Sequence, residues 1–307
     1  MALRKLTPEL EELAKKECNE EPARLQQDLQ HIRDWLAKQP HLKSRTDDQF
    51  LTMFLRGCKF SLERTKAKLD MYHTLKTALP EFYTNRDPML PEIQHLMKLG
   101  VLVPLPEPDD QGRRVAIMRQ GLYDPNKIKI QDVFKFNMML MDVLLEEDDR
   151  SVICGTVSIL DHDKMTMAHM MHFSPSLAKK GTTLFQEGYP IRPKAMHHIN
   201  FNSAFTAIFN MFKSFMKEKL QKRLHMHSGI ETMFESVPKR ILPLEYGGEA
   251  GPIDKLAEEW KKKVEARRDW LIESEKYGCN EKKRPGKPKT HEDLFGLEGS
   301  FRQLNVD

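Results

Sequence analysis

Residues 194–227 read KAMHHINFNSAFTAIFNMFKSFMKEKLQKRLHMH and change periodicity twice. The segments 194–200 and 223–227 are short runs typical of strands, whereas the apolar residues of 200–220 recur with the period of a helix. A strand, a helix and a second strand in this order predict a parallel strand pair with the helix packed on it.

The preceding hundred residues continue this alternation. Two short apolar runs, 101–103 and 114–118, flank a turn and predict paired strands. The predicted elements that follow are a helix at about 130–145, a strand at 152–160, helices at about 165–171 and 175–187, and the strand at 194–200. The fold class is therefore α/β, with a mostly parallel sheet and helices packed on it.

The N-terminal region has helical periodicity only. Leu25, Leu29, Ile32 and Leu36 share one face of a predicted helix that ends at Pro40. Further helices, capped by residues 46–48 and by Ser61, extend to about residue 88 and predict a small helical bundle.

The C-terminal region begins with a charged helix predicted from about residue 252 to 277. The basic segment 282–289 is expected to be an exposed linker. The apolar side chains expected to dock the tail on the body are Leu294, Phe295, Leu297, Phe301 and Leu304. The chain thus divides into a helical domain at 1–92, an α/β domain at 93–250 and a C-terminal part at 251–307.

The composition is that of a globular protein, with 39% hydrophobic and 31% charged residues in a chain of 307. The net charge of +4 is too small to indicate nucleic-acid binding. The four cysteines are far apart and are expected to be reduced thiols, and no signal peptide or membrane span is visible, so we expect a cytoplasmic protein. The 18 methionines suit either an adaptable binding wall or an irregular core.

A search for catalytic motifs finds no phosphate loop, dinucleotide fingerprint, zinc-protease helix or nucleophile elbow. Asp161, His162 and Asp163 follow a predicted strand, where catalytic groups often lie, but a helix-capping turn explains them better. The histidine pairs at 197–198 and at 225 and 227 are more typical of core or edge positions than of a metal site. We therefore expect no catalytic residue, no metal and no cofactor.

The predicted helix at 200–220 has an unusually wide aromatic face, with five of the 16 phenylalanines within 15 residues. Periodicity alone favours an ordinary helix that covers a sheet, while a helix that covers a ligand or enters a membrane interface is the alternative. The cations that flank this helix could meet in space and bind phosphate, or form a solvated rim. These cations are Arg192, Lys194, Lys219, Lys222 and Arg223.

The segment 54–60, FLRGCKF, resembles the signature of the helical domain that precedes CRAL-TRIO lipid-binding domains. Further segments follow in that family's order, namely SPSL at 174–177, YPIRPK at 189–194, HIN at 198–200, KEKL at 217–220, RLHMH at 223–227 and LPLEYGG at 242–248. The chain is similar to the tocopherol-transfer-like, retinaldehyde-binding-like and clavesin-like groups of this family, and its residues 294–301 are similar to arthropod members.

The resemblance implies a hydrophobic pocket between the sheet and a mobile lid helix. The residues implied to line it are Phe134, Asn137, Met141, Leu160, Met165, Leu184, Phe185, Tyr189, Phe205, Ile208, Phe209, Phe212 and Met216. It also implies that Arg192, Lys194, Lys219 and Arg223 bind a phosphoinositide headgroup. Four positions depart from the tocopherol group: Cys58 replaces a cleft arginine, Met141 a pocket serine, Met165 a pocket tryptophan and Ser214 a lid proline.

The expected function is that of an intracellular, non-enzymatic carrier that binds one hydrophobic molecule of the tocopherol or retinoid class and exchanges it at phosphoinositide-containing membranes. We expect the carrier to be a monomer. A lipid-sensing regulatory module that acts on a partner protein is the alternative, and a lipid-modifying enzyme is less favoured. Transient membrane association is expected, and nucleic-acid binding is not. The departures at the pocket leave the ligand open between tocopherol, a retinoid, a carotenoid and a phospholipid.

Overall fold

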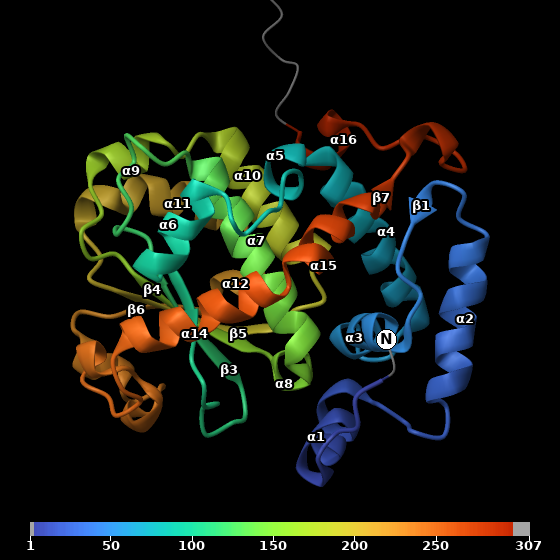
Figure 1. Ribbon diagram of the computed structural model, residues 1–307, viewed down its shortest axis with the longest axis horizontal. Coiled ribbons are helices and arrows are strands. Elements are labelled where there is room, and N and C mark those ends of the chain that lie inside the picture. Colours follow the sequence, from blue (N-terminus) through green and yellow to red (C-terminus); the bar gives the residue numbers. More distant parts are fainter. Residues whose placement is uncertain (1–2, 297–307) are drawn as a thin grey trace, which may run out of the picture.

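The computed structural model describes residues 3–296 and is mixed α/β (Figure 1). Its central sheet has the strand order β2-β3-β4-β5-β6, in which β2 is antiparallel to β3 and the other neighbours are parallel. The strands are β2 (Leu102–Pro104), β3 (Arg114–Arg119), β4 (Thr156–Asp161), β5 (Pro193–Ile199) and β6 (Leu224–Met226). This arrangement confirms the predicted mostly parallel sheet.

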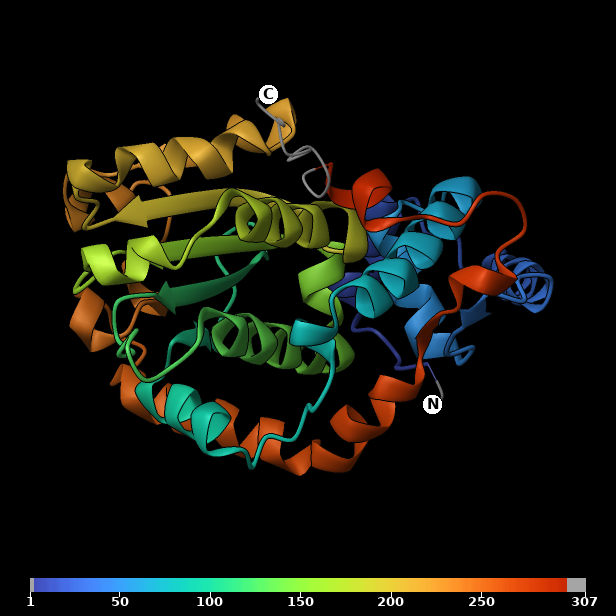
Figure 2. The same ribbon diagram turned by 90° about the horizontal axis from the view of Figure 1, so that it is seen from above.

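The N-terminal helices as far as α5 and the C-terminal residues 278–296 lie together on one side of the sheet, whereas α6 lies apart from them beside residues 253–266 (Figures 1 and 2). The N-terminal helices are α1 (Pro8–Cys18), α2 (Leu25–Ala37), α3 (Asp48–Gly57), α4 (Leu62–Ala78), α5 (Pro80–Tyr83) and α6 (Pro91–Leu99). Asp47 caps α3 through a hydrogen bond from the backbone N–H of Phe50, as the sequence predicted. One buried cluster contains residues of these helices together with residues of α7 (Ile130–Glu147), so the division at residues 92 and 250 stays a prediction.

The two faces of the sheet have different partners because successive strand side chains point to opposite faces. One face is packed against residues between 230 and 257, which include α13 (Ile230–Met233) and the start of α14 (Ile253–Ala266). Its buried strand residues are Val115, Ile117, Val157, Ile159, Ala195 and Ile199. The opposite face, which includes Met118, Leu160 and His198, borders a cavity.

Several predicted boundaries are wrong, each for a local reason. The strand expected at 152–160 begins only at Thr156, because Asp148 caps a short helix, α8 (Asp149–Ile153), and Gly155 then turns the chain at a φ of +91°. By contrast, the helix expected at 175–187 is present as α10 (Pro175–Thr183) continued by a π-helical turn at Leu184–Gly188, and α9 (Met167–Met171) precedes it. The helix expected at 252–277 is divided at Arg267 into α14 and α15 (Arg268–Glu273).

The helix expected at 200–220 is also divided. It comprises a 3₁₀ turn (Ser203–Phe205), α11 (Thr206–Ser214) and α12 (Glu218–Gln221), and Phe201 precedes all three. We call residues 203–221 the lid segment. None of the helices in the described part of the chain is long and apolar enough to cross a membrane.

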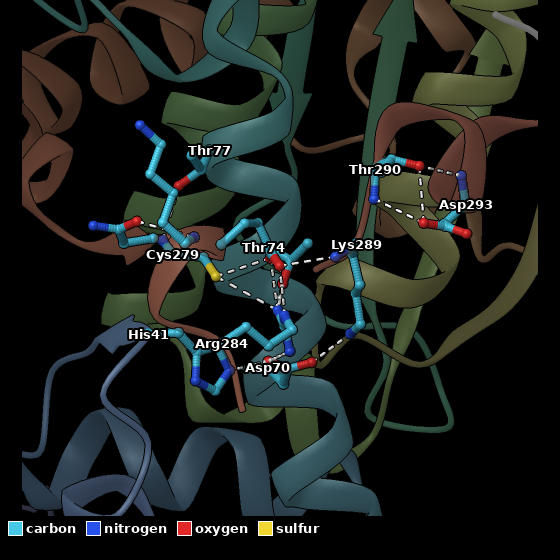
Figure 3. Close-up of polar contacts among 12 residues, drawn as sticks. His41, Asp70, Thr74, Thr77, Cys279, Arg284, Lys289, Thr290 and Asp293 are labelled. Atoms are coloured by element: carbon cyan, nitrogen blue, oxygen red, sulfur yellow. Dashed lines mark hydrogen bonds and ion pairs between the residues drawn. The ribbon is translucent and has the colours of Figure 1, made fainter. Parts of the chain in front are cut away.

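The basic segment 282–289 is mostly exposed, as the sequence predicted, but it is not a free linker, because two of its cations, Arg284 and Lys289, bind α4 (Figure 3). Arg284 donates to Asp70 at 2.8 Å and to the Thr74 hydroxyl at 2.8 Å, and Lys289 also pairs with Asp70. Burial raises the pKa of Asp70, but the hydrogen bonds from Lys289, His41 and Arg284 outweigh it and hold that pKa below its ordinary value.

The same C-terminal segment is joined to the helical region at two further places. The strand β7 (Gly278–Cys279) pairs with β1 (Leu42–Lys43), and the Cys279 N–H donates to the Thr77 hydroxyl at 2.8 Å. At α16 (His291–Phe295) the Phe295 ring is buried in the large core, which fits the predicted docking of the tail. Of the other predicted anchors, Leu294 packs beside this core, whereas Leu297, Phe301 and Leu304 lie outside the described residues.

Candidate ligand-binding cavity

A cavity of about 280 Å³ lies between the sheet face that carries Met118, Leu160 and His198 and the helices α7, α10 and α11. Seven of the 18 methionines and seven of the 16 phenylalanines contribute to its wall. They are Met118, Met138, Met141, Met165, Met170, Met196, Met216, Phe134, Phe173, Phe185, Phe201, Phe205, Phe209 and Phe212. A wall of flexible thioethers and flat rings suits an apolar molecule of irregular shape.

Twelve of the thirteen residues expected to bind the ligand line this cavity. They are Phe134, Asn137, Met141, Leu160, Met165, Leu184, Phe185, Phe205, Ile208, Phe209, Phe212 and Met216. Helix α7, strand β4 with the loop after it, the π-helical turn and the lid segment, which are distant in sequence, bring them together. Whether they contact a ligand stays a prediction.

Tyr189 is the residue that the structure does not place at the cavity. Its side chain is only 2% exposed and packs edge-on against Tyr72, with ring centroids 5.7 Å apart. The Tyr189 hydroxyl donates to Asp142 at 2.9 Å and accepts from the Tyr83 hydroxyl at 3.0 Å. Because this buried network holds both the ring and the hydroxyl, Tyr189 is a core residue.

Of the sheet residues that line the cavity, the sequence analysis named Leu160 and missed the others. Ala116, Ser158, Met196 and His198 point to the same face as Leu160. Alternation along the predicted strands was the available signal, since residues two apart in a strand share a face. Alternation alone could not identify these residues, because it does not tell which face of the sheet is packed against residues 230–257 and which face borders the cavity.

The lid segment closes the cavity through its aromatic side chains. Phe209 packs edge-on against Phe201 at 5.5 Å, and Phe212 packs edge-on against Phe173 at 5.2 Å. Phe205 is only 5% exposed, whereas no residue of α11 itself is fully buried. The segment therefore covers the ligand space without being embedded in the core.

Gln186, in the π-helical turn, joins the lid segment where α11 ends. Its side-chain amide donates to the Phe215 carbonyl at 3.1 Å, and its Oε1 accepts from the Lys217 N–H at 2.7 Å. These two bonds satisfy backbone groups that the break between α11 and α12 leaves without helical partners. Ser214, at the position for which the resemblance implies a lid proline, is the exposed last residue of α11.

The residues considered as catalytic or metal-binding candidates have structural partners. Asp161 accepts from the Asp163 N–H, from the Asn200 amide at 2.8 Å and from the Tyr246 hydroxyl at 2.6 Å. His197 contacts His227 at 2.9 Å. No group of three or more metal-binding side chains occurs within residues 3–296.

Two of the histidines considered are, however, part of the cavity wall. His162 and His198 stack with ring centroids 5.2 Å apart, and His162 Nε2 lies 2.9 Å from His198 Nδ1. They are 36 residues apart in sequence, and the parallel register of β4 and β5 brings them together.

Three of the four cations expected to bind a headgroup gather beside β5. Arg192 and Lys194 share the Glu17 carboxylate, at 2.7 and 3.1 Å, and the hydrogen bonds from Lys194 and Arg192 lower the pKa of Glu17. Arg223 donates to the Pro193 carbonyl, and burial together with the nearby Arg192 lowers its pKa. Lys219, in α12, is exposed. The sequence analysis did not anticipate that an acidic residue of α1 occupies this cleft.

The position that the resemblance assigns to a further cleft arginine does not supply a cation. Cys58 is buried, and burial raises the pKa of its thiol. The adjacent Lys59 is exposed.

Comparison with known proteins assigns the family. The CRAL/TRIO domain matches residues 99–248, and a Pinta-like UBA domain matches residues 21–93. The alpha-tocopherol transfer protein-like protein of Homo sapiens is 33% identical over 251 residues, which cover 81% of this chain and 72% of that protein. Clavesin-2 of Rattus norvegicus is 27% identical over 81% of this chain and 76% of its own length.

Among solved structures, the crystal structure of Sfh5 covers 68% of this chain and 74% of its own, at 15% identity and a TM-score of 0.48. The domain match and the 33% identity over most of both chains agree with the motif order and with the cavity. The chain therefore belongs to the CRAL-TRIO family, which carries lipophilic ligands.

Proposed function

We propose that this protein is an intracellular carrier that encloses one hydrophobic small molecule, of the tocopherol or retinoid class, and exchanges it at phosphoinositide-containing membranes. The observation that carries the proposal is the cavity of about 280 Å³ with its methionine and phenylalanine wall. A lipophile favours such a site over water by about 0.8 kcal/mol for each buried methylene group, so it requires a carrier to cross an aqueous compartment.

Loading and unloading require the lid segment to move. Its contacts to the body include aromatic edge contacts, the two Gln186 hydrogen bonds, the ion pair of Lys217 with Glu187 and the Lys179 ammonium over the Phe215 ring. These contacts can be broken without disrupting the main core. A membrane that binds the neighbouring cations more tightly in the open arrangement would shift the population toward it.

Arg192, Lys194 and Arg223 support the membrane step, with Lys219 at the exposed edge. Each cation near an anionic surface contributes roughly 1 kcal/mol to docking. Glu17 already neutralises part of the cleft, so a headgroup phosphate has to displace this carboxylate from Arg192 and Lys194. On docking, the headgroup phosphate and Glu17 of α1 therefore compete for Arg192 and Lys194.

The experiment measures the transfer of a fluorescent tocopherol by the protein to vesicles that contain or lack phosphatidylinositol bisphosphate. The double variant Lys219→Ala with Arg223→Ala is expected to lose the stimulation by the phosphoinositide. The control is Lys255→Ala with Lys262→Ala, which removes the same charge from the exposed face of α14. Glu17→Gln is expected to strengthen vesicle binding, and Glu12→Gln, exposed on the same helix, to leave it unchanged. Equal stimulation in all variants would refute the headgroup role.

The regulatory alternative loses part of its support. The basic segment 282–289 was its expected partner surface, yet Arg284 and Lys289 are bound to Asp70. Retention of the bound lipid in the presence of acceptor vesicles would favour this alternative over the carrier.

A further inference from the structure

The cavity wall contains a chain of hydrogen-bonding groups that the carrier function by itself does not require, and the inference drawn from it rests on that proposed function. Met165 Sδ lies 3.1 Å from His162 Nδ1, and His162 Nε2 lies 2.9 Å from His198 Nδ1. All three residues line the cavity. We call them the Met165–His162–His198 relay.

The direction of the hydrogen bonds in this relay follows from its first member. Burial lowers the pKa of His162 to about 4 and that of His198 to about 3, so both rings are neutral near pH 7. A neutral imidazole carries one N–H and one acceptor nitrogen, and a thioether sulfur can only accept. His162 Nδ1 therefore carries the proton that points to Met165, and its Nε2 accepts from His198 Nδ1–H.

The far nitrogen of the relay is consequently an acceptor without a donor. His198 Nε2 is buried and has no hydrogen-bond partner among the described residues. The Phe209 ring of the lid segment packs edge-on against the His198 ring at 5.1 Å, and Phe201 packs edge-on against His162 at 5.3 Å, so aromatic rings shield the relay from bulk water. Leaving such a group unpaired costs about 1–3 kcal/mol, and buried polar groups are therefore nearly always paired.

A second buried acceptor in the cavity wall also lacks a hydrogen-bond donor. Asn137 Oδ1, on α7, is buried and also has no partner among the described residues. The wall is predominantly apolar, and within it these two buried atoms are acceptors that lack a donor.

We infer that the cavity selects a lipophilic alcohol or phenol, whose hydroxyl donates a hydrogen bond to His198 Nε2. A hydroxyl supplies the missing proton and gains a bond that no hydrocarbon can make. An aldehyde, ketone or ester of the same shape presents only lone pairs to His198 Nε2, so its oxygen is repelled. The relay thus acts as a specificity determinant that distinguishes an alcohol from its oxidised or esterified form.

The binding test compares all-trans-retinol with all-trans-retinal, which share their hydrocarbon skeleton and differ in the terminal O–H donor. The unmodified protein is expected to bind retinol roughly tenfold more tightly, the effect of one buried hydrogen bond. His198→Leu is expected to abolish this preference, and Met165→Leu to reduce it because the relay then loses the group that fixes its direction. His95→Leu, a histidine change at an exposed position outside the cavity, is the matched control and is expected to keep the preference.

A second measurement does not depend on the probe. Nitrogen-15 NMR of the imidazole rings in the cargo-free protein is expected to show the Nδ1–H tautomer for both His162 and His198. An Nε2–H tautomer at His198 would overturn the inference. Equal affinity for retinol and retinal would also overturn it while leaving the carrier function intact, whereas failure to bind either probe, with no lipophile found in the cavity, would count against both.

Discussion

Gly57 lies where α3 meets the residues that lead into β5. A Cβ atom at this position would lie 2.2 Å from the Pro190 carbonyl oxygen, much closer than any side-chain carbon can approach. The neighbouring Arg56 is 1% exposed and pairs with Glu20 at 2.7 Å and Asp149 at 2.8 Å. The family signature at 54–60 therefore joins the helical region to the sheet-containing region.

Gly57→Ala is expected to lower the free energy of unfolding by about 1–3 kcal/mol, because the added methyl group forces the backbone at Pro190 to move. Chemical denaturation monitored by circular dichroism measures the change. Gly229→Ala is the control, since a Cβ there meets only the Glu231 carboxylate, the end of a flexible side chain. An equal effect of the two substitutions would contradict this role of Gly57.

At the residue scale, the sequence predicted most of the cavity wall but not its chemistry. Resemblance assigned twelve cavity residues correctly to one space, yet it also assigned Tyr189, whose hydroxyl is held by Asp142 in a different part of the core. The pairing of His162 with His198 depends on strand register, which a single sequence does not define.

At the element scale, the lid segment is the part of the fold most different from its prediction. A wide aromatic face predicted one continuous helix, but α11 ends at Ser214 and α12 begins at Glu218. Periodicity could not reveal this break, because the bonds that stabilise it come from Gln186, in a distant segment.

Gln186→Ala is expected to speed ligand release several-fold, because the backbone at Phe215 and Lys217 loses its partners and the end of α11 is freed. Stopped-flow transfer of a fluorescent lipophile to vesicles measures the rate. Gln30→Ala, on the exposed face of α2, is the control. A release rate that stays at the unmodified value would show that this end of the lid segment does not control opening.

At the scale of the whole molecule, three buried histidines and the half-buried His162 couple stability to pH. Burial lowers the pKa of His162 and His197 to about 4 and that of His73 and His198 to about 3. An unfolded histidine titrates near pH 6.5, so between roughly pH 4 and 6.5 the unfolded chain binds more protons than the folded chain. This contribution to stability is complete above pH 6.5 and is lost as the pH falls toward 4.

The free energy of unfolding is therefore expected to be lower at pH 5 than at pH 7. Carboxylates whose pKa values are lowered by ion pairs, such as Asp70 and Glu17, lose their contribution mainly at lower pH and do not explain a change in this window. Urea denaturation at the two pH values measures the difference. A free energy at pH 5 that equals or exceeds the value at pH 7 would contradict the assignment of these rings as neutral in the folded chain.

The overall architecture was predictable because strand and helix periods alternate along residues 101–227 and because the family motifs occur in order. The attachment of the C-terminal segment to α4 was not predictable, because a run of lysine and arginine predicts exposure to solvent. Its position depends on Asp70, more than 200 residues earlier, which binds both Arg284 and Lys289.

The central claim, that the cavity encloses one lipophile, is tested most directly by native mass spectrometry of the protein purified from its own tissue. One hydrophobic small molecule per chain is predicted, and Ser158→Trp, which fills the cavity from β4, is expected to abolish it. Ser228→Trp, at an exposed position, is the control and should retain the molecule. A chain without any bound lipophile, or one whose ligand persists in Ser158→Trp, would contradict the account.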